Sequence, residues 1–125
     1  MNPIDVIITE TEVILNPIYF EFNKSNITKE GAFELDKLVQ VMKNNDKLVI
    51  FAKSHTDSRG SDKYNMILSD NRAKATVQYV QSKGIDASRI SGKGYGESEP
   101  KVVCGEDCTE EQHAQNRRSE FLIVK

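Results

Sequence analysis

Two charged residues, Asp57 and Arg72, have positions in the sequence that suggest a binding role. Arg72 falls in a helix predicted over about residues 62–83. The helical repeat places it, with Asn65, on or beside the apolar face of that helix. This face is defined by Leu68, Ala75, Tyr79 and Val80. Burying a guanidinium without an anionic partner is costly, so a carboxylate is expected nearby. The nearest candidate is Asp57, which follows a buried strand.

The Asp57 and Arg72 pair has two interpretations. In the first, the two side chains form a structural salt bridge and Asn65 donates to the loop backbone. In the second, they flank a pocket for a zwitterion, because the planar fork of Arg binds a carboxylate and Asp binds an ammonium. Ligands of open α/β sheets bind at the C-terminal ends of strands, which is where Asp57 is expected. A free amino-acid centre is a ligand of this kind, and the residues alone leave both interpretations open.

The apolar pattern also predicts the elements that position this pair. Strands are expected at residues 18–22, 48–52, 89–95 and 119–124, and helices at about 28–44 and 62–83. The alternation at 18–22 fits a half-buried strand, whereas the continuous apolar run 48–52 is typical of a strand covered on both faces. These two strands and the helix between them would form a βαβ unit. The predicted fold class is α/β (an α+β sandwich, βαβαββ-like), with one mixed sheet packed against helices.

Composition limits the classes of function. The chain has 125 residues, which is enough for one domain, and 38% hydrophobic and 29% charged residues, as in a globular protein. A net charge of −2 without a basic run disfavours a nucleic-acid partner. Residues 1–17 are interpreted as an extension or short strands, and residues 18–125 as the domain. The start lacks the pattern of a secretion signal, so we expect a cytoplasmic protein or a domain of a longer exported chain.

The two cysteines, Cys104 and Cys108, lie four residues apart in a segment that is typical of a loop. A disulfide is favoured, because this spacing closes a small ring. A metal site with His113 would be one ligand short, and unpaired thiols are the third alternative. We expect no metal and no cofactor.

Two sequence features resemble catalytic motifs. Ser54 and His55 are neighbours on a strand and point to opposite faces, so they cannot act together as nucleophile and base. The glycine-rich residues 92–96 lack the pattern of a phosphate-binding loop, and a close approach of backbone is the better explanation. We therefore expect no catalytic residue and no enzyme activity.

Several blocks of sequence, in order, resemble the OmpA C-terminal-like domain. The blocks are His55-Thr56-Asp57-Ser58-Arg59-Gly60, Asn65-x-x-Leu68-Ser69-x-x-Arg72-Ala73, Tyr79, Gly84-Ile85, Gly94-Tyr95-Gly96-Glu97, Pro100 and Asn116-Arg117-Arg118-Ser119-Glu120. The resemblance covers roughly residues 18–125. It implies a periplasmic module that binds peptidoglycan without a covalent bond and anchors an outer-membrane protein to the cell wall.

The resemblance also implies roles for single residues. The ligand is the diaminopimelate of the peptidoglycan stem peptide, whose side chain ends in an amino-acid centre. Asp57 and Arg72 match the family's ligand-binding residues, and Thr56, Asn65 and Leu68 match positions that shape or line the pocket. Asn116, Arg117 and Arg118 match a stretch that we interpret as mainly structural. The first strand reads Phe20-Glu21-Phe22-Asn23 instead of Phe-Asp-Phe-Asp, which puts its ligand contacts in doubt.

Further expectations follow from the same resemblance. The paired cysteines and the Tyr95-Gly96-Glu97 block look like the Bacteroidetes-type version, in which upstream regions supply the association with the membrane. An exported location favours oxidation of Cys104 and Cys108. Homodimerisation is left open. The alternative function is a protein–protein adaptor of the same fold that does not bind the wall.

Overall fold

The protein forms one mixed sheet with helices, as a computed structural model describes it for residues 6–16, 18–21, 23–104 and 107–124. Its elements are β1 (Ile7–Ile8), β2 (Glu12–Ile14), α1 (Lys29–Asn44), β3 (Ile50–Ser54), α2 (Asp62–Ser82), the 3₁₀ helix η1 (Ala87–Arg89), β4 (Ile90–Gly94), α3 (Glu110–Asn116) and β5 (Ser119–Ile123). The strand order is β1-β2-β5-β3-β4. β3 and β4 are parallel, and the other pairs are antiparallel. The predicted fold class is confirmed.

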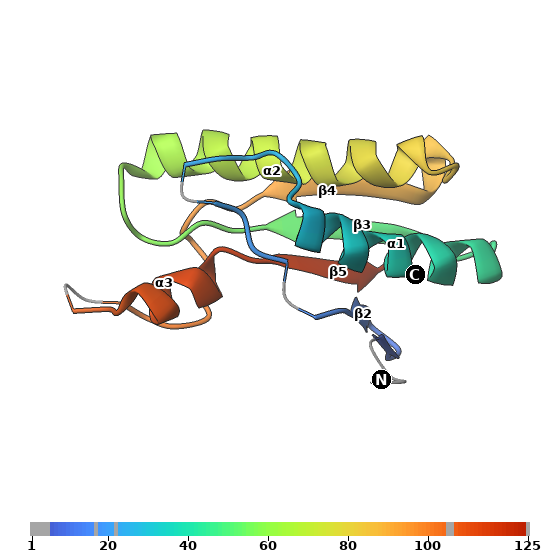
Figure 1. Ribbon diagram of the computed structural model, residues 1–125, viewed down its shortest axis with the longest axis horizontal. Coiled ribbons are helices and arrows are strands. Elements are labelled where there is room, and N and C mark those ends of the chain that lie inside the picture. Colours follow the sequence, from blue (N-terminus) through green and yellow to red (C-terminus); the bar gives the residue numbers. More distant parts are fainter. Residues whose placement is uncertain (1–5, 17, 22, 105–106, 125) are drawn as a thin grey trace.

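Helices α1 and α2 run along the sheet, and α3 lies apart at the end where β3 finishes (Figure 1). Along β3, Ile50, Ala52 and Ser54 are buried, whereas Phe51 and Lys53 are partly exposed. The expectation of a strand at 48–52 covered on both faces was therefore wrong: the strand begins two residues later and only one face is fully covered. A continuous apolar run shows which residue types a strand contains, but it does not show which face of the strand a helix covers.

Helix α1 has the boundaries that its sequence predicts. The hydroxyl of Thr28 caps it by accepting a hydrogen bond from the backbone N–H of Gly31 at 3.0 Å. The helix ends at Asn44, with Asn45 as its C-cap. The apolar side chains of α1 meet those of the strands in one core, which consists of Val13, Ile18, Phe20, Leu35, Leu38, Val39, Met42, Ile50, Ala52, Val80, Ile85, Ile90 and Phe121.

The predicted strand at 18–22 is wrong for the residues that the structure describes, since 18–21 are not in a strand, and Phe22 lies outside the described residues. The alternation of burial is nevertheless present, because Ile18 and Phe20 are buried. The edge of β5 at Phe121 and Leu122 is paired with β2 instead. The alternating sequence pattern thus predicted which residues are buried in the core, but it did not predict which segment is hydrogen-bonded into the sheet. The βαβ unit with adjacent parallel strands is β3–α2–β4.

Helix α2 packs very closely on β4 because of Gly94. A Cβ atom at this glycine would lie 2.2 Å from the backbone nitrogen of Asp70, so no other residue fits there. The Asp70 carboxylate and the Ser69 hydroxyl accept hydrogen bonds from the backbone N–H groups of Gly94 and Gly96, both at 2.8 Å. The close backbone approach expected for residues 92–96 is confirmed. This close packing and the two hydrogen bonds hold the polar face of α2 over the end of the sheet.

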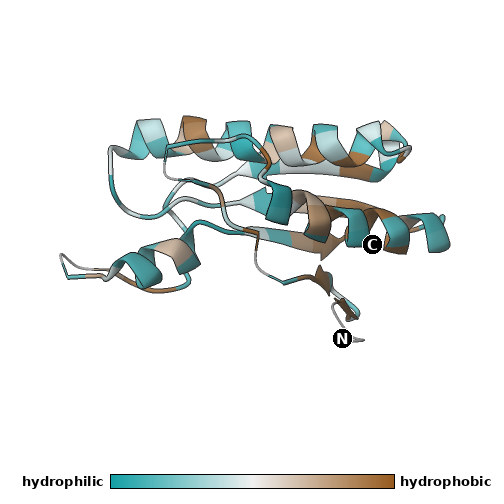
Figure 2. Cartoon of the chain, in the orientation of Figure 1, coloured by the Kyte–Doolittle hydropathy of each residue, from teal (hydrophilic) through white to brown (hydrophobic). Residues whose placement is uncertain are grey.

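Helix α3 was not predicted, although its capping sequence is readable. The Thr109 hydroxyl accepts from the backbone N–H of Gln112, and the Gln112 side chain accepts from the backbone N–H of Thr109, which is a capping box. Figure 2 shows α3 and the loop between β3 and α2 as largely hydrophilic, in contrast to the apolar parts of the strands. None of the helices in the described ranges is long and apolar enough to cross a membrane.

Candidate ligand-binding site

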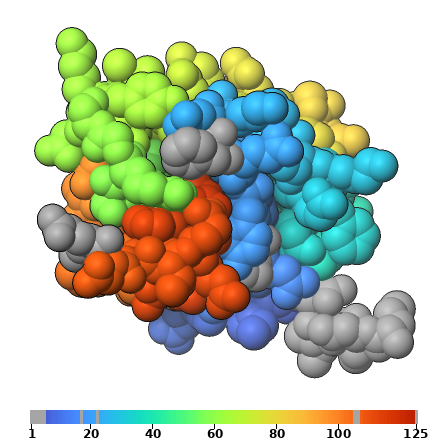
Figure 3. Space-filling view, turned by 60° about the vertical axis from the view of Figure 1, so that its left-hand side comes forward, coloured from blue at the N-terminus to red at the C-terminus, as the bar shows by residue number. Residues whose placement is uncertain are grey.

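A small pocket at the C-terminal end of β3 contains the residues that the sequence predicted for the site. It is lined by Thr56, Asp57, Asn65, Leu68 and Arg72, together with Asn23, Arg59 and Arg117. Figure 3 shows this end of the molecule, where the green loop after β3, the blue segment before α1 and the orange-red region of α3 meet. The fold therefore brings together all five predicted residues, and it adds Arg59 from the same loop and Asn23 and Arg117 from distant parts of the sequence.

The carboxylate of Asp57 is buried and fully engaged in hydrogen bonds. It accepts from the backbone N, Nε and Nη2 of Arg59 at 3.0, 3.3 and 2.7 Å, and from Nη1 of Arg117 at 2.8 Å. Burial alone would raise the pKa of Asp57, but the hydrogen bonds from Arg59 and Arg117 outweigh it and lower the pKa to about 2. Asp57 is therefore ionised at every physiological pH.

Glu110, at the start of α3, joins the two arginines from the outside. Its carboxylate oxygens accept from Nη1 of Arg59 at 3.0 Å and from Nη2 of Arg117 at 2.8 Å. Asp57 and Glu110 are thus bridged by two guanidinium groups in a closed ring of four charges. Glu110 is largely exposed, with 64% of its side chain accessible, whereas the Asp57 side chain is 4% accessible.

Arg72 is 0% exposed and makes no ion pair with Asp57. Its Nε and Nη2 donate to the backbone carbonyls of Lys24 and Glu21 at 2.8 and 3.1 Å, and its guanidinium lies 4.9 Å from the centre of the Phe20 ring. The first interpretation of the sequence, a structural Asp57–Arg72 salt bridge, is therefore wrong. Burial, with a smaller contribution from the nearby charge of Arg117, lowers the pKa of Arg72 to about 10.

Three buried polar groups that line the pocket lack a hydrogen-bond partner in the part of the chain that the structure describes. They are Nη1 of Arg72, Nε of Arg117 and the hydroxyl of Thr56. Two of them are charged donors, and buried donors are normally satisfied. The pocket also contains three guanidinium groups and a single carboxylate, in a chain whose net charge is −2. Its electrostatics therefore favour an anionic group of a ligand.

Asn65 holds the loop that carries Asp57. Its side-chain amide lies within hydrogen-bonding distance of the carbonyls of Asp57 and Arg59, at 3.3 and 3.0 Å, and of the Glu97 carboxylate, at 2.7 Å. Leu68, one turn further along α2, is 9% exposed and supplies an apolar wall. Asn65 thus positions the loop, as the first interpretation of the sequence expected for this residue.

Arg59 and Arg117 are the charged site residues that the sequence analysis missed. Arg117 was interpreted as mainly structural with Asn116 and Arg118, but its Nη1 donates to Asp57. Asn116 is structural, since its side chain bonds the backbone of Lys101 and Val102. The available signal for Arg117 was the Arg117-Arg118 pair directly after α3. The pair alone does not show which of the two arginines faces the pocket.

Ser54 and His55 do not form a catalytic pair. The Ser54 hydroxyl has no partner among the described residues, and Nε2 of His55 lies 2.8 Å from the Glu120 carboxylate. His55 pairs with Glu120 and stacks on Tyr95, with ring centres 5.9 Å apart. Its position is therefore explained by packing.

Within the described ranges, one group of side chains could offer three ligands to a metal ion, namely His55, Glu99 and Glu120. Nζ of Lys53 lies 2.5 Å from the Glu99 carboxylate, so the ammonium group of Lys53 already pairs with one of the three possible metal ligands. The alternative metal site at the cysteines is excluded, since Cys104 and Cys108 form a disulfide. The predicted disulfide is thereby confirmed.

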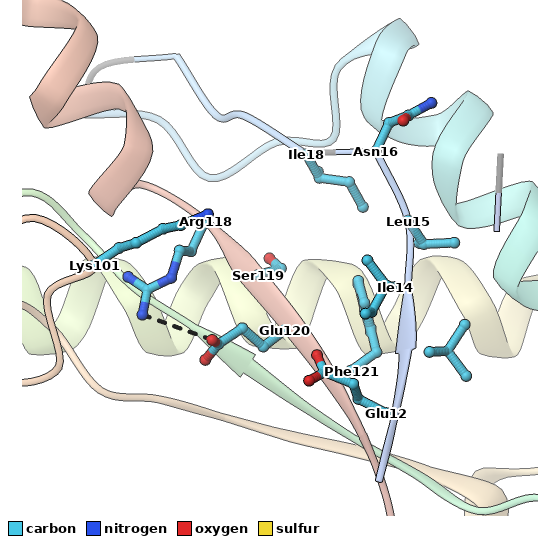
Figure 4. A pocket seen from close by; sticks show the side chains of 11 residues that line it. Glu12, Ile14, Leu15, Asn16, Ile18, Lys101, Arg118, Ser119, Glu120 and Phe121 are labelled. Carbon is cyan, nitrogen blue, oxygen red and sulfur yellow. Dashed lines mark ion pairs between the residues drawn. The ribbon is translucent and has the colours of Figure 1, made fainter. Parts of the chain in front are cut away.

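A roomier cleft of about 250 Å³ lies where β2 turns away from β5 (Figure 4). Asn16 and Lys101 line it, together with the start of β5. None of the five predicted binding residues contributes to it, and the facing charges of Arg118 and Glu120 already pair at 3.7 Å. Chemistry rather than volume therefore identifies the smaller pocket as the candidate site.

Solved structures share this fold. The peptidoglycan-associated lipoprotein from Burkholderia pseudomallei is similar with a TM-score of 0.77 and 27% identity, over 86% of this chain and 89% of that one. The C-terminal domain of MotB from Helicobacter pylori has a TM-score of 0.77 at 19% identity, over 90% of this chain and 86% of that one, a likeness of fold alone. The class is thus an α/β domain with the fold of these two structures.

The sequence comparisons identify the family. The OmpA family matches residues 19–117. The chain is 38% identical over 107 residues to a peptidoglycan-associated lipoprotein from Buchnera aphidicola subsp. Baizongia pistaciae, covering 86% of this chain and 60% of the relative. It is 41% identical over 106 residues to outer membrane protein A from Bordetella avium, covering 85% of this chain and 53% of the relative. The chain belongs to the OmpA family.

Family membership confirms the main resemblance and agrees with the prediction that the chain is not an enzyme. The chain spans 60% and 53% of the length of these two relatives, and between 28% and 41% of the length of other similar outer membrane proteins A. Its assignment to the Bacteroidetes-type version and the domain boundary at residue 18 stay predictions.

Proposed function

We propose that this domain binds peptidoglycan non-covalently through the diaminopimelate of the stem peptide, and so anchors an envelope protein to the cell wall. The observation that carries the proposal is the set of buried donors without an acceptor, above all Nη1 of Arg72. A carboxylate is the group that such donors bind best. Family membership supports a periplasmic location in an envelope-associated protein.

The pocket suits both charges of an amino-acid centre. The carboxylate of the diaminopimelate side chain would pair with Arg72, beside Nε of Arg117 and the Thr56 hydroxyl. The ammonium on the same carbon would pair with Asp57, which stays ionised because its pKa is about 2. Asn65 would hold the loop and Leu68 would pack against the aliphatic chain of the ligand.

Names of related proteins point to the same partner. One relative is called a peptidoglycan-associated lipoprotein, and a solved structure with a TM-score of 0.76 is described as a cell wall anchor of the type VI secretion system from Pseudomonas aeruginosa. The second of these is only 21% identical, so it supports the fold and not the ligand contacts. The ligand assignment therefore depends on the chemistry of the pocket.

The test compares two cell walls that differ in one carboxylate. Sacculi with diaminopimelate should retain the protein, and sacculi with lysine at the same position should bind about tenfold more weakly or worse. The reason is that a lost charge-assisted hydrogen bond costs about 1.5–3 kcal/mol. Calorimetric titration with free meso-diaminopimelate and with lysine repeats the comparison without the glycan.

Two results would overturn the proposal. Equal binding to both walls would show that the carboxylate is not recognised. Absence of binding to either wall, with the protein folded by circular dichroism, would favour the alternative of a protein–protein adaptor.

A further inference from the structure

The pocket is too narrow for an amino-acid ligand as it stands. Its cavity measures about 10 Å³, which is room for about one water molecule. A carbon that carries both an ammonium and a carboxylate needs several times that space. At least one lining side chain must therefore move before an amino-acid centre can reach Asp57.

Arg59 is the lining side chain that directly blocks Asp57. Its side chain supplies two of the four hydrogen bonds that the Asp57 carboxylate accepts, from Nε and Nη2, and so takes up sites that a ligand ammonium would use. A further bond comes from the backbone N–H of Arg59 and does not depend on the side chain. Of the three arginines in the pocket it is also the most accessible: its side chain is 37% exposed, against 9% for Arg117 and 0% for Arg72. Its movement therefore requires the least rearrangement.

Glu110 lowers the cost of moving Arg59. It accepts from Nη1 of Arg59 at 3.0 Å, while Nη2 and Nε of the same guanidinium face Asp57. When Arg59 turns away from Asp57, it can keep its bond to Glu110 at the exposed end of α3. Arg117 stays on Asp57 through Nη1, so the buried carboxylate is never left without a cation.

We propose that Arg59 is an intramolecular competitor of the ligand, occupying the place of the ligand ammonium on Asp57 and closing the pocket until an ammonium replaces it. This inference rests on the proposed function. It also makes Arg59 a determinant of specificity. A ligand with a carboxylate but without an ammonium has no cation to exchange for Arg59, so it leaves the pocket closed. The chain thus selects for a zwitterion, although its pocket contains three cations and one anion.

The test is a titration of the full chain with free meso-diaminopimelate, comparing the parent with Arg59→Ala. If the open form of the parent is populated at about 10% or less, removing the competitor should tighten binding about tenfold or more. Arg59→Lys keeps a cation that can pair with Asp57 but loses the two-donor fork, so its affinity should lie between those of the parent and Arg59→Ala. Arg59→Gln keeps the size without the charge and should also bind more tightly than the parent.

A spectroscopic readout follows the side chain itself. In NMR spectra, the Nε–H signal of Arg59 should lose the shift caused by Asp57 when the ligand saturates the protein, whereas the signals of Arg89, far from the pocket, should not move. A ligand whose amino group is acetylated should bind the parent about tenfold more weakly than meso-diaminopimelate does.

The outcomes separate the two proposals. If neither the parent nor Arg59→Ala binds diaminopimelate, the proposed function fails. If the parent binds and both folded variants, Arg59→Ala and Arg59→Gln, bind no more tightly, the competitor role is overturned and the proposed function stands.

Discussion

Replacing Arg72 by methionine should remove binding and leave the domain folded. Arg72 is 0% exposed and has no carboxylate partner among the described residues. Burial lowers its pKa from the usual arginine value to about 10, which corresponds to about 3 kcal/mol against the charged form. Methionine does not carry this cost, and it fills the space of the aliphatic part of arginine.

The contacts of the Arg72 guanidinium stabilise the folded protein and so oppose this burial cost. Its hydrogen bonds to the carbonyls of Lys24 and Glu21 contribute about 1.5–3 kcal/mol each, and its contact with the Phe20 ring about 1–2 kcal/mol. Subtracting the burial cost of about 3 kcal/mol leaves a net loss of about 1–5 kcal/mol for Arg72→Met. We expect the lower half of this range, because Lys24 and Glu21 are exposed residues and water can replace the lost donors.

The assay is urea unfolding followed by circular dichroism, together with sedimentation of the variant with sacculi. Arg89→Met is the matched control. Arg89 also donates to backbone carbonyls, those of Leu48, Met42 and Asn45, but it does not line the pocket. The control should lose stability and keep binding, whereas Arg72→Met should lose binding completely. Retained binding by folded Arg72→Met, or parallel behaviour of the two variants, would refute the reasoning.

Two further predictions concern the loop that carries the buried carboxylate. The pKa of Asp57 is lowered from 3.8 to about 2, so its ion pairs should contribute up to about 2 kcal/mol of stability above pH 4, and this contribution should disappear as the pH falls through 3.8 towards 2. Denaturant titrations of the parent and Asp57→Ala should therefore differ at pH 7 and converge near pH 2, and a difference that is independent of pH would contradict the assignment. Asn65→Leu should cost about 1–3 kcal/mol, because it leaves the carbonyls of Asp57 and Arg59 without their donor. A melting temperature of Asn65→Leu at or above that of the parent would show that these bonds do not stabilise the loop.

Local sequence determined the helices and the unusual polar face of α2. The hydroxyl of Thr28 caps α1 whatever the rest of the chain does, because the bond lies within one turn. The spacing of Asn65, Leu68 and Arg72 put an amide and a guanidinium on the buried face of α2, and all three are buried. Helical periodicity connects residues three and four apart, so it can be read without a fold.

The strands were less predictable, because pairing depends on distant segments. Residues 18–21 alternate in burial as a strand does, but the edge of β5 at Phe121 is paired with Val13 of β2. Which of two apolar segments completes a sheet depends on register and on the path of the chain. The exposure of one face of β3 likewise follows from where α1 and α2 lie.

The distant partners of the two predicted binding residues were decided only by the tertiary structure. The sequence supplied a buried arginine and a carboxylate near it, and their opposite charges suggested that they pair with each other. In the fold, Asp57 instead pairs with Arg59 in its own loop and with Arg117, sixty residues further along. Arg72 reaches the backbone of Glu21 and Lys24. Residue types fix which charges must be satisfied, but the packing of α2 and the position of α3 fix which groups are within 3 Å of them. Hydrogen bonds act only over that distance, so the identity of each partner is a property of the fold.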